Sequence, residues 1–200
     1  MKNLYKFIIK PHKERYNNSI KFDDKELILN TKIETFQSVS KLAEIVDTPI
    51  NIPSPLEKGD LILVHHNIFR RYYDIRGKEK NGGCYFKDDL FMCDPMQIYM
   101  YKKDSWKTNL DYCFVSPIYN DDEWSNNIEK PLIGIVKYSN KYLQGKGIKE
   151  NCLVGFSPNS EFEFVFEGTR LYCMKSNDIV LNYGYKENEK EYNPSWAKSS

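Results

Sequence analysis

The sequence predicts an all-β protein, and three of its features support that prediction. Ala, the best helix former, occurs only twice in 200 residues, whereas Tyr and Phe, which favour strands, together number 26. Short apolar runs recur between turn signals, as in β-barrels and β-sandwiches. Residues 161–166 alternate between polar and apolar side chains, which is typical of a strand with one buried face.

Charge and composition exclude several classes of protein. The 29 Lys and Arg residues nearly balance the 28 Asp and Glu residues, so we do not expect a nucleic-acid partner bound through phosphates. No apolar run approaches the roughly 18 residues of a membrane span, and the N-terminus lacks the apolar stretch of a signal peptide. The five scattered cysteines are therefore expected to be reduced thiols, which favours a cytoplasmic protein without membrane contact.

The first half of the chain is predicted to hold a series of short strands and two irregular segments. Pro53 and Pro55 exclude a helix or central strand over residues 51–55, because proline lacks a backbone donor. Residues 72–83 are basic and contain glycine, so we expect a loop there. Strands are predicted at residues 4–10, 42–46 and 61–64, and short strands or turns at 85–86, 90–92 and 97–101.

The second half restarts the same kind of pattern near residue 104. A polar loop is predicted at 120–130, and residues 184–200 lack periodicity, so we expect them to form a tail or arm. Strands are predicted at residues 112–115, 132–138, 153–156, 161–166, 171–174 and 179–181.

The order of elements in the first half matches the order in the second. Lys10-Pro11 parallels Ser116-Pro117, and residues 41–46 parallel 132–136. The buried run at 61–64 then parallels 153–156, and 96–100 parallels 177–181. We interpret this as a tandem duplication, with two halves of one larger β fold as the alternative.

These segments resemble the GroES-like family of small co-chaperonins, the ten-kilodalton lids of large chaperonins. The opening run Phe7-Ile8-Ile9-Lys10-Pro11, the turn and strand Lys58-Gly59-Asp60-Leu61-Ile62-Leu63-Val64 and the closing stretch Leu171 to Leu181 carry the resemblance. It covers most of residues 4–183 and implies two tandem GroES-like β-barrels with long loops. The first would span residues 1–103 with an insertion at 65–87 that is foreign to the small lids, the second 104–183, and residues 184–200 would form a C-terminal arm.

The resemblance also implies a function and a partner. The family binds the large chaperonin through a mobile loop with an apolar tripeptide, and Leu27, Ile28 and Leu29 look like that tripeptide. Three aliphatic side chains supply roughly 1.5–3 kcal/mol each, and ordering the loop costs about 1–2 kcal/mol per residue. One loop therefore binds weakly, and a ring homo-oligomer would convert weak contacts into avidity. The alternative is that residues 27–29 form a short strand packed in the barrel.

Two further clusters are candidate interfaces. Residues 70–80 interleave basic side chains with tyrosines, which is compatible with a protein interface, a solvated loop or a single-stranded nucleic-acid site. The residues concerned are Arg70, Arg71, Tyr72, Tyr73 and Arg76. Trp196, near the C-terminus, is expected to anchor the arm on a neighbouring subunit.

We find no motif for catalysis, a cofactor or a metal. His65 and His66 are adjacent, and neighbouring strand residues point to opposite faces, so a shared metal is not expected. The sequence lacks a P-loop, a dinucleotide-binding glycine pattern and a nucleophile elbow. The chain is therefore predicted to be a non-enzymatic co-chaperonin, with a structural assembly protein, such as a virion ring or adaptor component, as the alternative. The residue composition would suit a phage.

Overall fold

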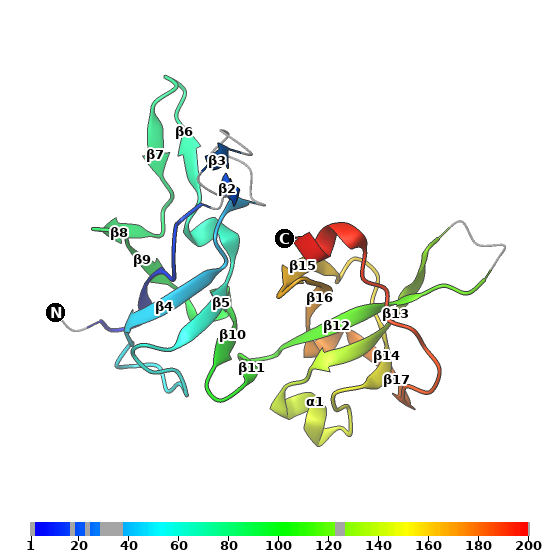
Figure 1. Cartoon of the computed structure of the whole chain (residues 1–200). Coiled ribbons are helices and arrows are strands. Elements are labelled where there is room, and N and C mark those ends of the chain that lie inside the picture. The colour runs from blue at the N-terminus through cyan, green and yellow to red at the C-terminus, as the bar shows by residue number, and fades with distance from the viewer. Residues whose placement is uncertain (1–2, 17–18, 23–24, 29–37, 123–126, 200) are drawn as a thin grey trace. The chain divides into compact units, whose positions relative to one another are not determined.

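The computed structural model describes residues 3–16, 19–22, 25–28, 38–122 and 127–199 (Figure 1). The chain divides into two compact units, Met1–Trp106 and Lys107–Ser200, here called unit 1 and unit 2. Strands hold 47% of the residues and helices 11%, which confirms the prediction of a mostly β protein with antiparallel sheets. Among the described residues, no helix has the length and apolar character needed to cross a bilayer.

Unit 1 is built on a seven-stranded antiparallel sheet. In spatial order this sheet runs β11-β10-β5-β4-β1-β9-β8. Its strands are β1 (Phe7–Pro11), β4 (Leu42–Asp47), β5 (Leu61–Val64), β8 (Tyr85–Lys87), β9 (Leu90–Cys93), β10 (Ile98–Lys102) and β11 (Trp106–Thr108), which crosses the boundary between the units. Two hairpins form separate two-stranded sheets, β2 (Ser19–Phe22) with β3 (Lys25–Ile28), and β6 (Arg71–Tyr73) with β7 (Glu79–Asn81). Two short 3-10 helices, η2 (His66–Ile68) and η3 (Pro95–Gln97), complete the unit.

Unit 2 is built on a six-stranded antiparallel sheet with the order β15-β16-β12-β13-β14-β17. Its strands are β12 (Tyr112–Tyr119), β13 (Glu129–Tyr138), β14 (Cys152–Phe156), β15 (Phe162–Phe166), β16 (Thr169–Lys175) and β17 (Ile179–Tyr185). The helices are α1 (Lys141–Gly145), η4 (Ser176–Asp178) and η5 (Ser195–Ser199).

The two sheets have the same strand order. In unit 1 the order is β10-β5-β4-β1-β9-β8, and in unit 2, read from the opposite edge, it is β17-β14-β13-β12-β16-β15. The strands at the same place in these two orders also follow one another in the same sequence along the chain. The one additional strand is β11, which covers the outer edge of β10. The short helices η3 and η4 also correspond, because each lies directly before the last matched strand.

The register of the central ladder, β1 with β4 in unit 1 and β12 with β13 in unit 2, is also the same around the matched prolines. Pro11 pairs with Ala43 in unit 1, and Pro117 pairs with Gly134 in unit 2. Both ladders also have a register shift at the same place, between Ile8 and Ile9 in β1 and between Phe114 and Val115 in β12. Strand pairing therefore places the same positions inward in each unit, and the matched residues Ile9, Val115, Ile62 and Val154 are all fully buried.

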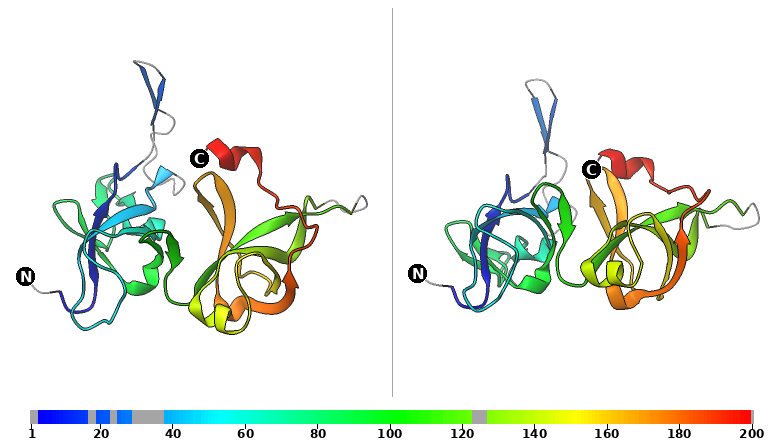
Figure 2. Two further views of the ribbon diagram at one scale, coloured as in Figure 1. Left: turned by 60° about the horizontal axis from the view of Figure 1, so that its bottom comes forward. Right: turned by 90° about the horizontal axis from the view of Figure 1, so that it is seen from below.

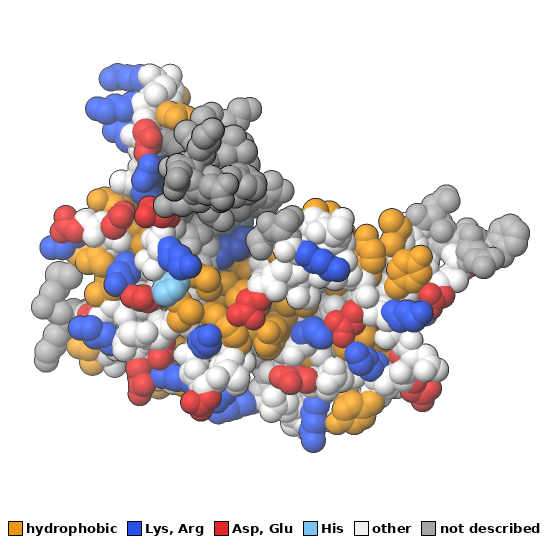
Figure 3. All heavy atoms as spheres, viewed as in Figure 1, with side chains coloured by type: hydrophobic (Ala, Val, Ile, Leu, Met, Phe, Trp, Pro, Cys, Tyr) orange, Lys and Arg blue, Asp and Glu red, His pale blue; other side chains and the backbone are white. Residues whose placement is uncertain are grey.

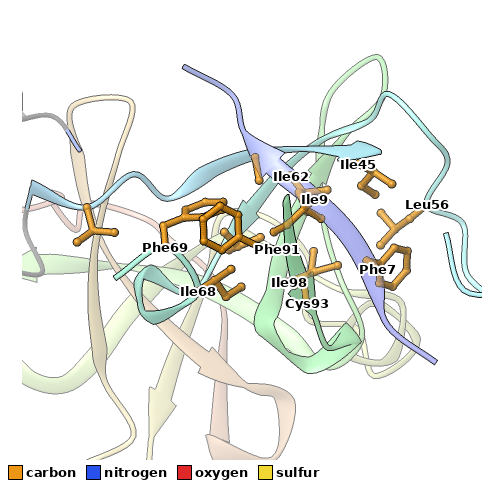
Figure 4. Packing of buried hydrophobic residues seen from close by; sticks show 13 residues of the cluster. Phe7, Ile9, Ile45, Leu56, Ile62, Ile68, Phe69, Phe91, Cys93 and Ile98 are labelled. Carbon is orange, nitrogen blue, oxygen red and sulfur yellow. The ribbon is translucent and has the colours of Figure 1, made fainter. Parts of the chain in front are cut away.

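The core of unit 1 lies against one face of its sheet and is rich in aromatic and β-branched side chains (Figure 4). Phe69 and Phe91 meet edge to face with ring centroids 4.8 Å apart, and Tyr85 packs on Phe91 in the same manner at 5.5 Å. Each large side chain buried in this way contributes roughly 1.5–3 kcal/mol. The core of unit 2 is a separate cluster that includes Val115, Val136, Val154 and Met174.

Neither sheet closes on itself within the described residues, since β11 and β8 end one sheet and β15 and β17 end the other. The tandem barrels implied by the resemblance therefore stay a prediction, while the antiparallel β-structure is confirmed.

Two segments differ from the prediction. Residues 72–83, expected to form a loop, contribute to the β6–β7 hairpin, because a tight turn at Asp74–Lys78 brings the two strands into register. The last strand, predicted at residues 179–181, runs on to Tyr185 and so includes the first residues of the predicted arm, since β14 continues to pair with it as far as Cys152.

Candidate partner-binding elements

The predicted chaperonin-binding tripeptide lies partly on the β2–β3 hairpin. Leu27 and Ile28 belong to β3, where they pair with Ile20 and Ser19 of β2, and Leu29 lies outside the described residues. The hairpin is a separate sheet and is not a strand of the seven-stranded sheet. The backbone of Leu27 and Ile28 therefore does not follow the alternative of a strand within the main sheet, and their role in binding stays a prediction.

The two ends of the segment that carries this hairpin are bonded to each other at residues 15–16 and 39–40, here called the stem. Tyr16 and Val39 form an isolated antiparallel bridge, and the backbone N–H of Ser40 donates to the carbonyl of Arg15 at 3.0 Å. Val39 is buried in the core of unit 1. The two ends of the segment between Tyr16 and Val39 therefore meet on the core.

Arg15 is a buried cation at this stem. Its Nε donates to the carbonyl of Phe69 at 2.5 Å, and its Nη1 donates to Oδ1 of Asn81 at 2.6 Å. Its Nη2 donates to the carbonyl of Arg70 at 3.4 Å, and the guanidinium lies 4.9 Å from the centroid of the Phe91 ring. Burial, assisted by the nearby Arg71, lowers the pKa of Arg15. These bonds join the stem to both ends of the β6–β7 hairpin.

Tyr16 makes a second connection to the same hairpin. Its hydroxyl accepts a hydrogen bond from the backbone N–H of Arg71 at 2.6 Å, and the Arg71 guanidinium lies 5.5 Å from the centroid of its ring. The base of β6–β7 and the stem of residues 17–38 are thus held by the same two adjacent residues, Arg15 and Tyr16.

The β6–β7 hairpin itself is an ordered projection (Figure 1). In its turn, Oδ1 of Asp74 accepts from the backbone N–H groups of Arg76 and Lys78, both at 2.9 Å, and Gly77 adopts a φ of +70°. Arg71 forms an ion pair with Glu79 at 3.0 Å. Of the predicted interface residues, Tyr72 and Tyr73 are about half exposed, and Arg76 is exposed at the turn.

The C-terminal segment, expected to extend as an arm, folds back on its own unit. Ile118 and Glu191 form a bridge, and the N–H of Tyr192 donates to the carbonyl of Pro117 at 2.9 Å. Asn193 accepts from the N–H of Arg170 and donates to the carbonyl of Gly168. Helix η5 lies beside the end of the β15–β16 hairpin (Figure 2).

Trp196 is on this folded segment and not on a free arm. Its side chain is 49% exposed, whereas the neighbouring Ala197 is fully buried. The predicted tail or arm thus packs on its own unit, where hydrogen bonds to residues far away in the sequence hold it. Whether Trp196 also contacts a second copy stays a prediction.

Sequence analysis predicted part of the last strand of unit 2, at residues 179–181, but missed its exposed apolar side chains. Strand β17 is the edge of its sheet, and Val180, Leu181, Tyr183 and Tyr185 are between 53% and 64% exposed. The alternation of Leu181, Tyr183 and Tyr185 with polar or small residues was the available signal. An exposed apolar edge strand is a ready template for pairing with another chain.

A cluster of polar side chains in unit 2 contains Glu, Arg and Tyr, which are residue types that occur in catalytic sites. Their hydrogen bonds, however, join neighbouring strands. Arg170 donates to Glu129 at 2.5 Å and to Glu163 at 2.6 Å, and the Tyr172 hydroxyl lies 2.5 Å from Glu129. Burial and the hydrogen bond to Glu129 raise the pKa of Tyr172 to about 12. The phenol therefore stays protonated and donates, and the cluster holds β13, β15 and β16 together.

His65 and His66 stack on one another, with ring centroids 4.5 Å apart, instead of pointing to opposite faces. The chain leaves β5 at this point, and Nδ1 of His65 accepts from the N–H of Asn67 at the start of η2. Burial lowers the pKa of both rings, that of His66 to about 4. In the described part of the chain, no group of three or more metal-ligating side chains comes together.

The comparisons with known proteins add no assignment. No protein-family model matches the sequence, and a search of the curated proteins finds no significant relative.

Proposed function

We propose that the protein is a non-enzymatic co-chaperonin, a duplicated GroES-like chain that assembles into a ring and closes a large ATP-dependent chaperonin. Leu27, Ile28 and Leu29 would bind the chaperonin, and the chaperonin would supply the ATP hydrolysis. The five free cysteines favour the reducing cytoplasm as the compartment.

One observation carries the proposal: the two units repeat the same six-strand order, and their central ladders share the register over Ile9–Pro11 and Val115–Pro117. Independent β folds of similar size have no reason to agree in ladder positions such as Pro11–Ala43 and Pro117–Gly134. The agreement supports a tandem duplication, and it supports the segment matches on which the resemblance to the small lids rests.

The position of the apolar tripeptide gives further support. The β2–β3 hairpin is inserted between the first two strands of the main sheet, β1 and β4, and lies outside that sheet. This is the place after the first strand at which the resemblance puts the chaperonin-binding loop. The equivalent connection in unit 2, between β12 and β13, has no apolar tripeptide, so unit 1 would be the binding unit.

Co-elution from a sizing column with a purified bacterial chaperonin, with and without ATP, tests this function. We expect nucleotide-dependent co-elution of the wild type, and its loss when Leu27, Ile28 and Leu29 are all changed to serine. A control variant changes three exposed aliphatic residues elsewhere, Ile50, Leu110 and Ile128, to serine. Failure of the wild type to bind in either condition, or equal losses in both variants, would reject the proposal.

A structural assembly protein is the second candidate, and the edge of β17 favours it. The corresponding strand of unit 1, β10, is covered by β11, whereas β17 is the last strand of its sheet and carries exposed apolar side chains. This edge would serve self-association with or without a chaperonin.

Sedimentation velocity tests whether the edge of β17 drives self-association. Changing Leu181 and Tyr183 to lysine should convert an oligomer to single chains, because charged side chains on an edge strand oppose pairing. Changing the similarly exposed Tyr142 of α1 to lysine should leave the oligomer intact. A stable oligomer that never binds chaperonin would favour the assembly protein over the lid.

A further inference from the structure

The β6–β7 hairpin is ordered although it has almost no core of its own. An isolated two-stranded hairpin is marginally stable in water. Here the Asp74 side chain fixes the turn, the Arg71–Glu79 ion pair links the strands, and Arg15 and Tyr16 hold the base. A projection that is rigid before binding loses less conformational entropy when it binds.

The surface of this hairpin differs from that of the rest of the chain. Residues 70–80 contain five basic and two acidic side chains and carry a net charge of +3, although the whole chain carries only +1. Lys and Arg gather at its outer end (Figure 3). Ile75, in the turn, is fully exposed, with Arg76 and Lys78 beside it in the chain.

The two faces of the hairpin are also unequal. One face holds the Arg71–Glu79 pair together with Asn81, which is bonded to Arg15. The register places Tyr72 opposite Lys80 on the other face, where both side chains are exposed. Exposed tyrosine, an exposed aliphatic tip and flanking cations are residue types that anchor protein interfaces.

We propose that the β6–β7 hairpin is a second docking element for the partner, inserting Ile75 into an apolar recess bordered by acidic side chains. This rests on the proposed function, since it takes the large chaperonin as the partner. A protein partner is favoured over nucleic acid because the outermost side chain is aliphatic. Moreover, one of the five cations, Arg71, is already paired within the hairpin.

The connection at Arg15 and Tyr16 makes the two elements work together. The same residues fix the stem of the segment that carries Leu27 and the base of the hairpin that carries Ile75. Both elements would therefore approach the partner from the same base. Two contacts carried by one chain bind more tightly than either contact alone.

Binding of variants to immobilised bacterial chaperonin, with ATP and at several salt concentrations, tests the inference. The tip variant Ile75→Ser and the charge variant Arg76→Glu/Lys78→Glu should each weaken binding about tenfold. Only the charge variant should also make binding less dependent on the salt concentration. Lys13→Glu/Lys58→Glu, with the same charge change at other exposed lysines of unit 1, should bind within about twofold of wild type.

Three outcomes would overturn the inference and are distinguishable. Wild-type binding that both hairpin variants retain would reject the hairpin alone and leave the proposed function intact. Absence of wild-type binding would reject both. Binding of a fluorescent single-stranded DNA at 150 mM salt that the charge variant abolishes would reassign the hairpin to nucleic acid. All substituted side chains are exposed, and an unchanged thermal unfolding midpoint would verify that each variant folds.

Discussion

Asn81 accepts a hydrogen bond at 2.6 Å from the guanidinium of Arg15, a residue 66 positions earlier in the chain. The same guanidinium donates to the carbonyls of Phe69 and Arg70. One buried side chain thus satisfies three acceptors at the base of the β6–β7 hairpin.

Replacing Arg15 with methionine should destabilise unit 1. The methionine side chain would still pack on Phe91, but three acceptors would lose their donors, at a cost of about 2–3 kcal/mol. Urea unfolding monitored by tryptophan and tyrosine fluorescence measures this. Arg76→Met, at the exposed turn, is the matched control and should change the free energy of unfolding by less than about 0.5 kcal/mol. Equal stability of the two variants would contradict the role assigned to Arg15.

Gly134 should tolerate no side chain. A Cβ atom there would lie 2.4 Å from Cγ1 of Val115 and 2.6 Å from the carbonyl oxygen of Ser116, so backbone as well as side chain would have to move. Gly134→Ala is expected to lower the stability of unit 2 by about 1–3 kcal/mol. A Cβ on Gly145 meets no atom within 4 Å, so Gly145→Ala should be neutral or slightly stabilising. Thermal unfolding of the two alanine variants distinguishes them.

Glu191 should make the C-terminal segment sensitive to acid. Burial raises the pKa of Glu191, but hydrogen bonds from Lys137 and Lys186 outweigh it and leave the pKa below its ordinary value of 4.5. A lowered folded-state pKa contributes stability above the unfolded pKa, and that stability is lost as the pH falls through the folded pKa. Wild type should therefore be more stable than Glu191→Gln at pH 7, and the difference should shrink below about pH 4.5.

Unfolding curves of both proteins between pH 7 and pH 3 measure this difference. A constant difference across that range would show that Glu191 acts only through packing. Trp196 fluorescence gives a local readout, because its segment is held by the same carboxylate.

The cysteines should react with alkylating reagents in a defined order. Burial raises the pKa of Cys93, Cys113 and Cys173, that of Cys113 to about 12, so their reactive thiolates are scarce at pH 8. Cys84 is only half-buried. Iodoacetamide should therefore modify Cys84 first in the native protein, as peptide mass spectrometry would detect. Rapid native modification of Cys113 would contradict the packing of unit 2.

The strands were largely predictable because their signals are local. The run Leu61–Val64 was expected as a strand and is β5, and the alternation over residues 161–166 falls on β15. The parallel drawn between Lys10-Pro11 and Ser116-Pro117 places the two prolines at equivalent ladder positions. Apolar periodicity and short motifs determine these elements without help from distant residues.

The elements that were missed depend on contacts between residues far apart in the sequence. The β6–β7 hairpin looks like a loop from its composition, and its base depends on Arg15. The C-terminal segment has no periodicity and depends on Lys137 and Asn193 bonds to other strands. The role of Leu27, Ile28 and Leu29 was inferred from resemblance alone and stays a prediction.

The two matched units carry different exposed elements, and this difference sets the number of docking elements per chain. Unit 1 carries both hairpins, whereas unit 2 carries the exposed edge of β17. A closed ring of these chains would contain two sheet units per chain but only one β6–β7 hairpin. The proposed docking hairpin would then occur once per chain although the sheet unit occurs twice, so a partner ring matched to such an assembly would need one acceptor site per chain.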